Sequence, residues 1–195
     1  QPSIWLIMKK GDLMRAVELI IKKRQGMRLN QDEIQEFVQG AASGSWPDYQ
    51  LAAMLMAIFI RGLDNQETTD LTLAMAKSGD MLDLSAITAF KVDKHSTGGV
   101  ADTTTLVLVP LVSACCVPVV KMSGRGLGFT GGTIDKLDAI PGFQVQLPPE
   151  RVLELIRQNK AVILSQSANL IPADKKIYAL RDVTGTIESI PLIAA

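Results

Sequence analysis

Side chains that bind metals are scarce in this sequence. It contains one histidine, His95, and two cysteines, Cys115 and Cys116, among 195 residues. A protein zinc site usually needs three or four such ligands, so the sequence predicts neither a metal site nor a metal cofactor. Adjacent cysteines rarely form a disulfide, and the apolar residues around this pair predict that both pack in a core. Without a secretory signal, a reducing cytoplasm is the expected location.

Long hydrophobic runs and net charge are also missing, and aromatic residues are few. No apolar run reaches the roughly 18 to 20 residues that cross a membrane. Lys and Arg number 20, Asp and Glu number 20, and aromatic residues make up only 5% of the chain. A neutral chain with few stacking side chains predicts neither a nucleic-acid partner nor a membrane partner.

The first 80 residues have the apolar spacing of helices, together with residues that typically begin and end them. We predict helices over residues 14–23, from Asn30 to just before Gly44, over 47–61 and over 65–77. Asn30 and Glu33 form a candidate capping box, and Asn65 is the expected cap of the fourth helix. Residues 1–80 are therefore predicted to form the first part of a small all-helical domain.

Strands and helices alternate after residue 86. Strands are predicted over 90–92, 118–122 and 161–164. Helices are predicted over 103–116, over 133–140, from Pro148 onward, and from Pro172 to the end of the chain. Pro110 opposes the first of these helices at a cost of about 3 kcal/mol, so a kink is expected there. The fold class is α/β: the start of a larger domain with a mainly parallel sheet over 81–171, and a return to the helical domain over 172–195.

Two glycine-rich segments are the main functional signal. KHSTGGVAD covers residues 94–102, and SGRGLGFTGGTID covers residues 123–135. Glycines allow backbone N–H groups to approach a ligand, and hydroxyls and lysines complete an anion cage. Phosphate is the ligand that needs all three. Neither segment is a Walker A loop, and the second lacks the full context of a dinucleotide fingerprint.

Four stretches together resemble the pyrimidine-nucleoside and thymidine phosphorylase family. They are the two glycine-rich segments, the second extended through DKLDAIPGF, together with AIFIRGLDNQET at 57–68 and SANLIPADKKIYALRDVTGTIESIPLI at 167–193. The similarity runs from about residue 14 to residue 195. It implies reversible phosphorolysis of uridine- or thymidine-type nucleosides, giving a free base and a pentose 1-phosphate. Inorganic phosphate is then a co-substrate, no further cofactor is needed, and the helical domain forms a homodimer.

The resemblance also implies roles for individual residues. His95 and Arg181 are the expected catalytic residues, and with Tyr178 they are expected to contact the pyrimidine. Asp102 matches an acid that follows the first loop, and we expect it to order the loop rather than act as a base. The residues expected to bind phosphate are Lys94, Ser96, Thr105, Lys121, Ser123 and Thr133.

Each of these residues also has an ordinary structural explanation. Thr105 and Thr133 are suitable helix caps, Ser123 suits a turn, and lysines are usually solvated. Arg181 beside Asp182 is also typical of an exposed helix pair. Two departures from the family pattern are Ala101, where glycine is usual, and Phe129, where histidine is common.

Two other functions fit parts of the same pattern. A phosphoribosyltransferase of the anthranilate type also uses a glycine-rich phosphate loop. A non-catalytic, phosphate-binding or dimerising fragment fits the absence of a serine and a lysine that the family carries just beyond the position of Ala195. Inorganic phosphate separates the three, because the phosphorylase consumes it, the transferase makes pyrophosphate and the binder releases nothing.

We predict that the 195-residue chain alone shows little phosphate-dependent release of thymine or uracil, whereas a longer chain is active. Losing two base contacts lowers transition-state binding by roughly two to four orders of magnitude. The measurement is ultraviolet detection of free base with and without phosphate. Full activity from a verified 195-residue polypeptide would contradict our placement of the base site.

Overall fold

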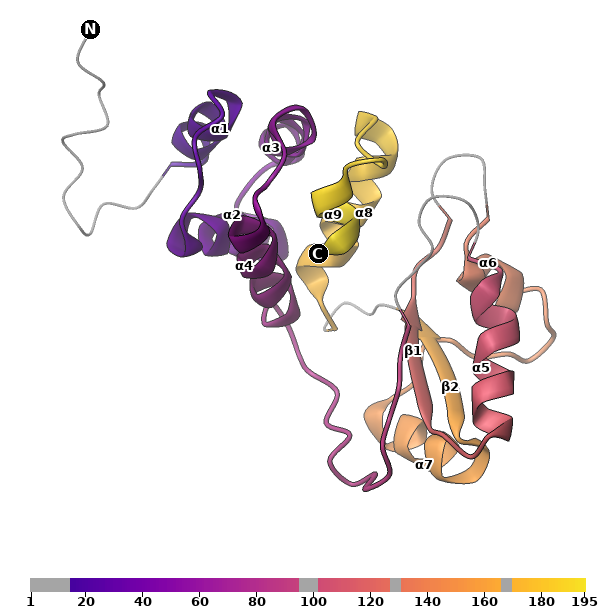
Figure 1. Cartoon of the computed structure of the whole chain (residues 1–195). Helices are drawn as coiled ribbons and strands as arrows, with labels where there is room; N and C mark the ends of the chain where they lie inside the picture. Colours follow the sequence, from indigo (N-terminus) through magenta and orange to yellow (C-terminus); the bar gives the residue numbers. More distant parts are fainter. Residues whose placement is uncertain (1–14, 95–101, 127–130, 166–169) are drawn as a thin grey trace, which may run out of the picture.

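The computed structural model describes residues 15–94, 102–126, 131–165 and 170–195. Figure 1 shows a group of helices beside an α/β group. The elements of the helical group are α1 (Ala16–Arg24), α2 (Gln31–Ser43), α3 (Asp48–Arg61), α4 (Asn65–Ala76), α8 (Pro172–Thr184) and α9 (Ile190–Ala194). Those of the α/β group are α5 (Thr104–Ala114), β1 (Val119–Ser123), α6 (Thr133–Leu137), α7 (Pro149–Asn159) and β2 (Ala161–Ser165). The predicted fold class is confirmed.

Local capping sets the start of two helices. Asn30 Oδ1 accepts the N–H of Glu33 at 2.9 Å, and Glu33 Oε2 accepts the N–H of Asn30 at 2.7 Å, so the predicted capping box is present. Helix α4 is capped by Asp64 rather than by Asn65, the predicted cap. Asp64 Oδ1 accepts the N–H of Glu67 at 2.8 Å. The helix therefore begins at Asn65, one residue after the first of two adjacent capping candidates.

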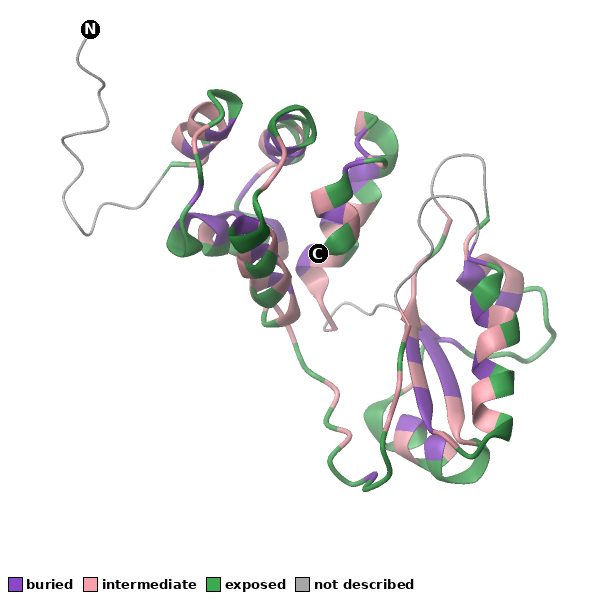
Figure 2. Ribbon diagram, in the orientation of Figure 1, coloured by how far each residue is buried: buried purple, intermediate pink, exposed green. Residues whose placement is uncertain are grey.

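One apolar cluster joins the early helices to the end of the chain. Fully buried Leu51, Met54 and Leu55 of α3 lie in the same cluster as Ala173 of α8 and Leu192 of α9. Figure 2 shows the buried residues on the facing sides of these helices. Because these segments share one cluster, residues more than 100 positions apart stabilise each other. The division into domains at residues 80 and 171 remains a prediction.

The end of the chain contains two helices rather than the single predicted one. Helix α8 ends at Gly185, which has φ 65° and so adopts the left-handed conformation that favours glycine. A short α9 follows after Ser189. The prediction of one continuous helix was wrong because the glycine C-cap reverses the chain direction.

The α/β group has three layers. β1 and β2 are parallel, with Val119 opposite Ala161, and Val92 forms an isolated parallel bridge with Val119. On one face Val109 of α5 clusters with Val119 and Ile163. On the other face, residues of α7 cluster with Val162 and Leu164. Both strands are therefore covered on both faces, as is usual for parallel strands.

Helix α5 runs through Pro110, as predicted. Pro110 is exposed, and it removes the hydrogen bond that a backbone N–H at this position would have given to the carbonyl of Leu106. The prediction that Cys115 and Cys116 pack in the core was wrong, since both thiols are exposed. They follow the last turn of α5, where Cys116 has φ 63° and turns the chain towards β1.

None of the helices in the described part of the chain has both the length and the hydropathy that crossing a membrane requires.

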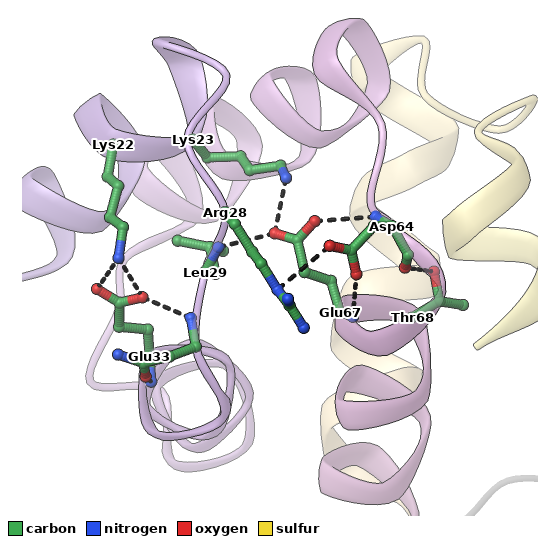
Figure 3. A network of polar contacts seen from close by, with 9 residues as sticks. Lys22, Lys23, Arg28, Leu29, Glu33, Asp64, Glu67 and Thr68 are labelled. Atoms are coloured by element: carbon green, nitrogen blue, oxygen red, sulfur yellow. Dashed lines mark hydrogen bonds and ion pairs between the residues drawn. The ribbon is translucent and has the colours of Figure 1, made fainter.

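A buried carboxylate holds α1, α4 and the loop between α1 and α2 together (Figure 3). Glu67 Oε1 lies 2.8 Å from Lys23 Nζ and accepts the N–H of Leu29 at 2.8 Å. Its Oε2 accepts the N–H of Asp64 at 2.9 Å. The side chains of Lys23 and Glu67 are only 4% and 3% exposed. The carboxylate thus satisfies a buried cation and two backbone donors from three segments.

We expect Glu67→Gln to lower the free energy of unfolding by about 3 kcal/mol, because Lys23 then keeps a buried charge without its counter-charge. The single amide oxygen of Gln also cannot replace both carboxylate oxygens. The measurement is urea unfolding followed by circular dichroism. Glu154→Gln, in an exposed pair with Arg151 on α7, is the control and should change stability little. Equal effects of the two substitutions would contradict the role of Glu67.

Candidate functional site

The two glycine-rich segments meet at one end of the sheet. Lys94 follows the bridge residue Val92, and β1 ends at Ser123. The hydroxyl of Thr133, at the first residue of α6, donates to the carbonyl oxygen of Asp102 at 3.1 Å. That bond joins the start of α6 to the start of α5. The carboxyl ends of the parallel strands and the N-termini of two helices therefore lie together, the usual place for a ligand in an α/β fold.

Asp102 connects the predicted site residues of the first segment. Its Oδ1 forms an ion pair with Lys94 Nζ, and its Oδ2 accepts the hydroxyl of Thr105 at 2.6 Å. Asp102 is buried, with 8% of its side chain exposed, and Thr105 is fully buried. The carboxylate also precedes α5, where a negative charge is favoured by the helix dipole. Lys94, Thr105 and Thr133 are thus brought together around one aspartate.

Two opposing effects act on the pKa of Asp102. Burial raises the pKa of this carboxyl, whereas the hydrogen bonds from Lys94 and Thr105 lower it, and the net result is a lowered pKa. The carboxylate is therefore ionised at neutral pH. Lys94 and Asp102 form a charged pair on either side of segment 95–101.

Lys121 supplies a second cation from β1. It is 7% exposed, and its Nζ lies 3.7 Å from Oδ1 of Asp93. Lys121 is buried, and among the described residues its ion-pair partner is the distant, half-exposed Asp93, so it is not an ordinary solvated surface lysine. Ser123 is half-buried at the end of the same strand. Both residues are on the strand that leads into the second glycine-rich segment.

Asp135 organises the second segment, and the sequence reasoning missed it. Its Oδ2 accepts the N–H of Gly126 at 2.7 Å and that of Gly132 at 2.8 Å, and its Oδ1 lies 2.9 Å from an Arg125 nitrogen. A Cβ atom on Gly132 would lie 2.4 Å from the nitrogen of Gly126, so only glycine fits there. An aspartate three residues after a glycine that begins a helix was the available signal.

The predicted base-side residues lie on α8. The hydroxyl of Tyr178 donates to the carbonyl oxygen of Arg125 at 3.0 Å, which joins α8 to the second segment. Arg181 is buried, and its guanidinium donates to the carbonyl oxygens of Leu192 at 2.7 Å, Ile187 at 2.5 Å and Thr186 at 3.4 Å. In this structure Arg181 therefore holds the α8–α9 connection, and its base-binding role remains a prediction.

Burial also shifts the pKa values of neighbouring groups on α8. It raises the pKa of the Asp174 carboxyl despite the opposing effect of Arg181, and it raises the pKa of the Tyr178 hydroxyl. Tyr178 is therefore neutral near pH 7 and acts as a hydrogen-bond donor. The helix presents titratable groups in a desolvated setting, as functional helices often do.

Several predicted positions lie outside the described residues. They are His95, Ser96, Ala101 and Phe129. Their predicted roles stay predictions. Within the described ranges no group of three His, Cys, Asp or Glu side chains is placed to hold a metal ion.

Family models match both groups of elements. Residues 17–79 match the helical bundle domain of a glycosyl transferase family, and residues 88–195 match the α/β domain of a glycosyl transferase family. The chain belongs to this family. It resembles the phosphorylase family predicted from the motifs, since curated relatives are named pyrimidine-nucleoside phosphorylase.

Three of these relatives show how far the similarity extends. The chain is 61% identical over 182 residues to the pyrimidine-nucleoside phosphorylase of Bacillus subtilis strain 168. It is 59% identical to that of Geobacillus stearothermophilus and 58% identical to that of Staphylococcus haemolyticus strain JCSC1435. Each match covers 93% of this chain and 42% of the relative. The chain therefore spans less than half the length of these curated relatives.

A solved structure confirms the fold. The crystal structure of anthranilate phosphoribosyltransferase from Thermus thermophilus matches with a TM-score of 0.70 and 23% identity. The match covers 90% of this chain and 53% of that chain. At this identity the likeness concerns the fold alone.

We predict that Asp135→Asn removes part of the acid sensitivity of the fold. The N–H of Gly126 is the main cause of the lowered pKa of Asp135, and the Gly132 N–H and Arg125 add to it, while burial opposes them. A lowered folded-state pKa stabilises the protein above the ordinary aspartate pKa of about 3.9, and this contribution disappears as the pH falls through the folded-state value.

The stability gap between wild type and Asp135→Asn should therefore be largest near neutral pH and shrink below about pH 4. Urea unfolding at a series of pH values measures it. Asp70→Asn is the control, because within the described part of the chain its carboxylate accepts only an exposed hydrogen bond from Gln66 of α4. A gap that grows in acid would show that Asp135 does not act through its ionised form.

Proposed function

We propose that this chain provides the phosphate-binding part of a pyrimidine-nucleoside phosphorylase. The observation that carries the proposal is the 58% to 61% identity to relatives of that name. The convergence of Lys94, Thr105 and Thr133 at the ends of parallel strands supports it. Because the chain spans 42% of those relatives, the complete activity is proposed for the whole protein.

The proposed reaction is the phosphorolysis of an N-glycosidic bond. A phosphate oxygen forms a bond to the anomeric carbon, and the bond from that carbon to the base nitrogen breaks with its electron pair going to the base. Lys94 and Lys121 supply positive charge for the phosphate, with hydroxyls of Ser96 and Ser123 as further candidates. The hydroxyls of Thr105 and Thr133 are donated to Asp102 in this structure. Holding the nucleophile below a sugar that develops positive charge lowers the barrier by positioning and electrostatics.

The base would be held from the other side of the site. Tyr178 is anchored on the second glycine-rich segment through the carbonyl of Arg125. His95 would donate a hydrogen bond or a proton to the departing pyrimidine, and Arg181 would face a carbonyl of the base. The Arg181 guanidinium has five N–H donors, and three of them are donated to carbonyl oxygens in this structure, which leaves two for a base carbonyl. No metal or redox cofactor enters the proposed chemistry.

A homodimer in the cytoplasm completes the proposal. Large apolar side chains are exposed on α3, where Tyr49 is 74% and Ile60 is 67% exposed. Burial of such side chains against a second copy would be favourable. This surface is on α3 of the helical group (Figure 1).

We expect Lys94→Ala to weaken phosphate binding by at least about tenfold, because one charge-assisted contact contributes roughly 1.5 to 3 kcal/mol. Equilibrium titration with labelled inorganic phosphate measures this. Lys77→Ala removes the same charge from the exposed end of α4 in the helical group and should leave phosphate affinity unchanged.

Equal phosphate affinity in wild type and Lys94→Ala would overturn the assignment of the anion site. The reaction itself is tested with uridine and thymidine on a chain of the relatives' length. Base release that needs inorganic phosphate supports the phosphorylase. In a separate assay with anthranilate and a phosphoribosyl diphosphate donor, release of pyrophosphate would favour the phosphoribosyltransferase.

A further inference from the structure

Asp102 makes contacts that go beyond the loop-ordering role expected from the sequence. Its two carboxylate oxygens bind different partners, Lys94 and Thr105, and its backbone carbonyl binds Thr133. These three partners come from three separate segments, and all three were predicted to bind phosphate. We propose that Asp102 is the positioning residue of the anion site, which acts on phosphate through Lys94. The inference rests on the proposed function.

The number of hydrogen-bond donors on Lys94, Thr105 and Thr133 supports this role. A lysine ammonium carries three N–H donors, so Lys94 can bind Asp102 and still offer two to an anion. Each threonine hydroxyl carries one proton, and those of Thr105 and Thr133 are both donated to Asp102. In this arrangement Lys94 keeps donors for phosphate, while the two threonines hold the aspartate that holds Lys94.

Burial makes the arrangement specific. Thr105 is fully buried and Thr133 is 2% exposed, so neither can exchange its partner for bulk water. The Lys94 side chain is 19% exposed, and Asp102 is its described ion-pair partner. Ordering a long lysine side chain costs conformational entropy, and the ion pair meets this cost before phosphate arrives.

A simple charge argument predicts the opposite effect. A carboxylate near an anion repels it, so removing the negative charge should strengthen phosphate binding. Asp93 tests this argument. Its carboxylate lies 3.7 Å from Lys121 and accepts the N–H of Lys94, but it is exposed and holds no described hydroxyl of α5 or α6. Asp93→Asn and Asp102→Asn remove the same charge from neighbouring places.

The experiment compares phosphate affinity in the 195-residue chain and its variants. We expect Asp102→Asn to weaken binding of inorganic phosphate by at least about tenfold, since Lys94 loses its fixed position. Asp93→Asn should leave the affinity unchanged or strengthen it. In a Lys94→Ala background, Asp102→Asn should change the affinity less than about twofold, because its effect passes through the missing lysine.

The outcomes separate the possible explanations. Stronger binding by Asp102→Asn would overturn the proposal in favour of simple repulsion. An equal further loss in the Lys94→Ala background would also overturn it, because it would show general damage to the site. If wild type binds phosphate and Lys94→Ala weakens it but Asp102→Asn does not, this inference fails and the proposed function stands. Absence of phosphate binding by wild type would overturn both.

A second variant guards against a folding defect. Asp102→Glu keeps the negative charge but moves the carboxylate by one methylene group relative to Lys94 and Thr105. We expect it to weaken phosphate binding, again only when Lys94 is present. Circular dichroism and urea unfolding show whether each variant is folded. Wild-type affinity in a folded Asp102→Glu would show that the position of the carboxylate does not matter.

Discussion

The arrangement of the candidate site depends on the charged, hydrogen-bonded contacts of one buried aspartate. Asp102 binds Lys94, Thr105 and Thr133. It thereby fixes the start of α5, the start of α6 and the position of Lys94, which follows the Val92 bridge. Asp135 does the same for the second glycine-rich segment through two backbone N–H groups. Two ionised carboxylates therefore shape a site that is predicted to bind an anion. Asp102 holds the cation Lys94, and Asp135 holds two backbone N–H groups.

The helical group contributes to the site through the end of the chain. Helix α8 packs its apolar face into the cluster of the early helices and places Tyr178 against the second glycine-rich segment. Arg181 fixes the connection to α9 through three carbonyl oxygens. The buried pair of Lys23 and Glu67 stabilises the same helical group from its other end. Core packing thus supports the element that carries the predicted base-side residues.

Local signals allowed most elements to be predicted. The capping box at Asn30, the proline before α7 and the β-branched runs of β1 and β2 depend on neighbouring residues, so the sequence reveals them. The errors arise where local signals were ambiguous or where packing decides the outcome. Asp64 and Asn65 are adjacent candidates for one cap, Gly185 ends a helix that otherwise shows helical spacing, and the exposure of Cys115 depends on how α5 packs.

The sequence by itself determined the residue types of the site: glycines, hydroxyls and lysines in two segments whose pattern resembles a phosphorylase family. Only the tertiary structure decided which side chains hold the others. The bond from Thr133 to Asp102 spans 31 residues and that from Tyr178 to Arg125 spans 53. Such partners are chosen by the packing of α5, α6 and α8, because a buried hydroxyl must find an acceptor wherever the fold brings one.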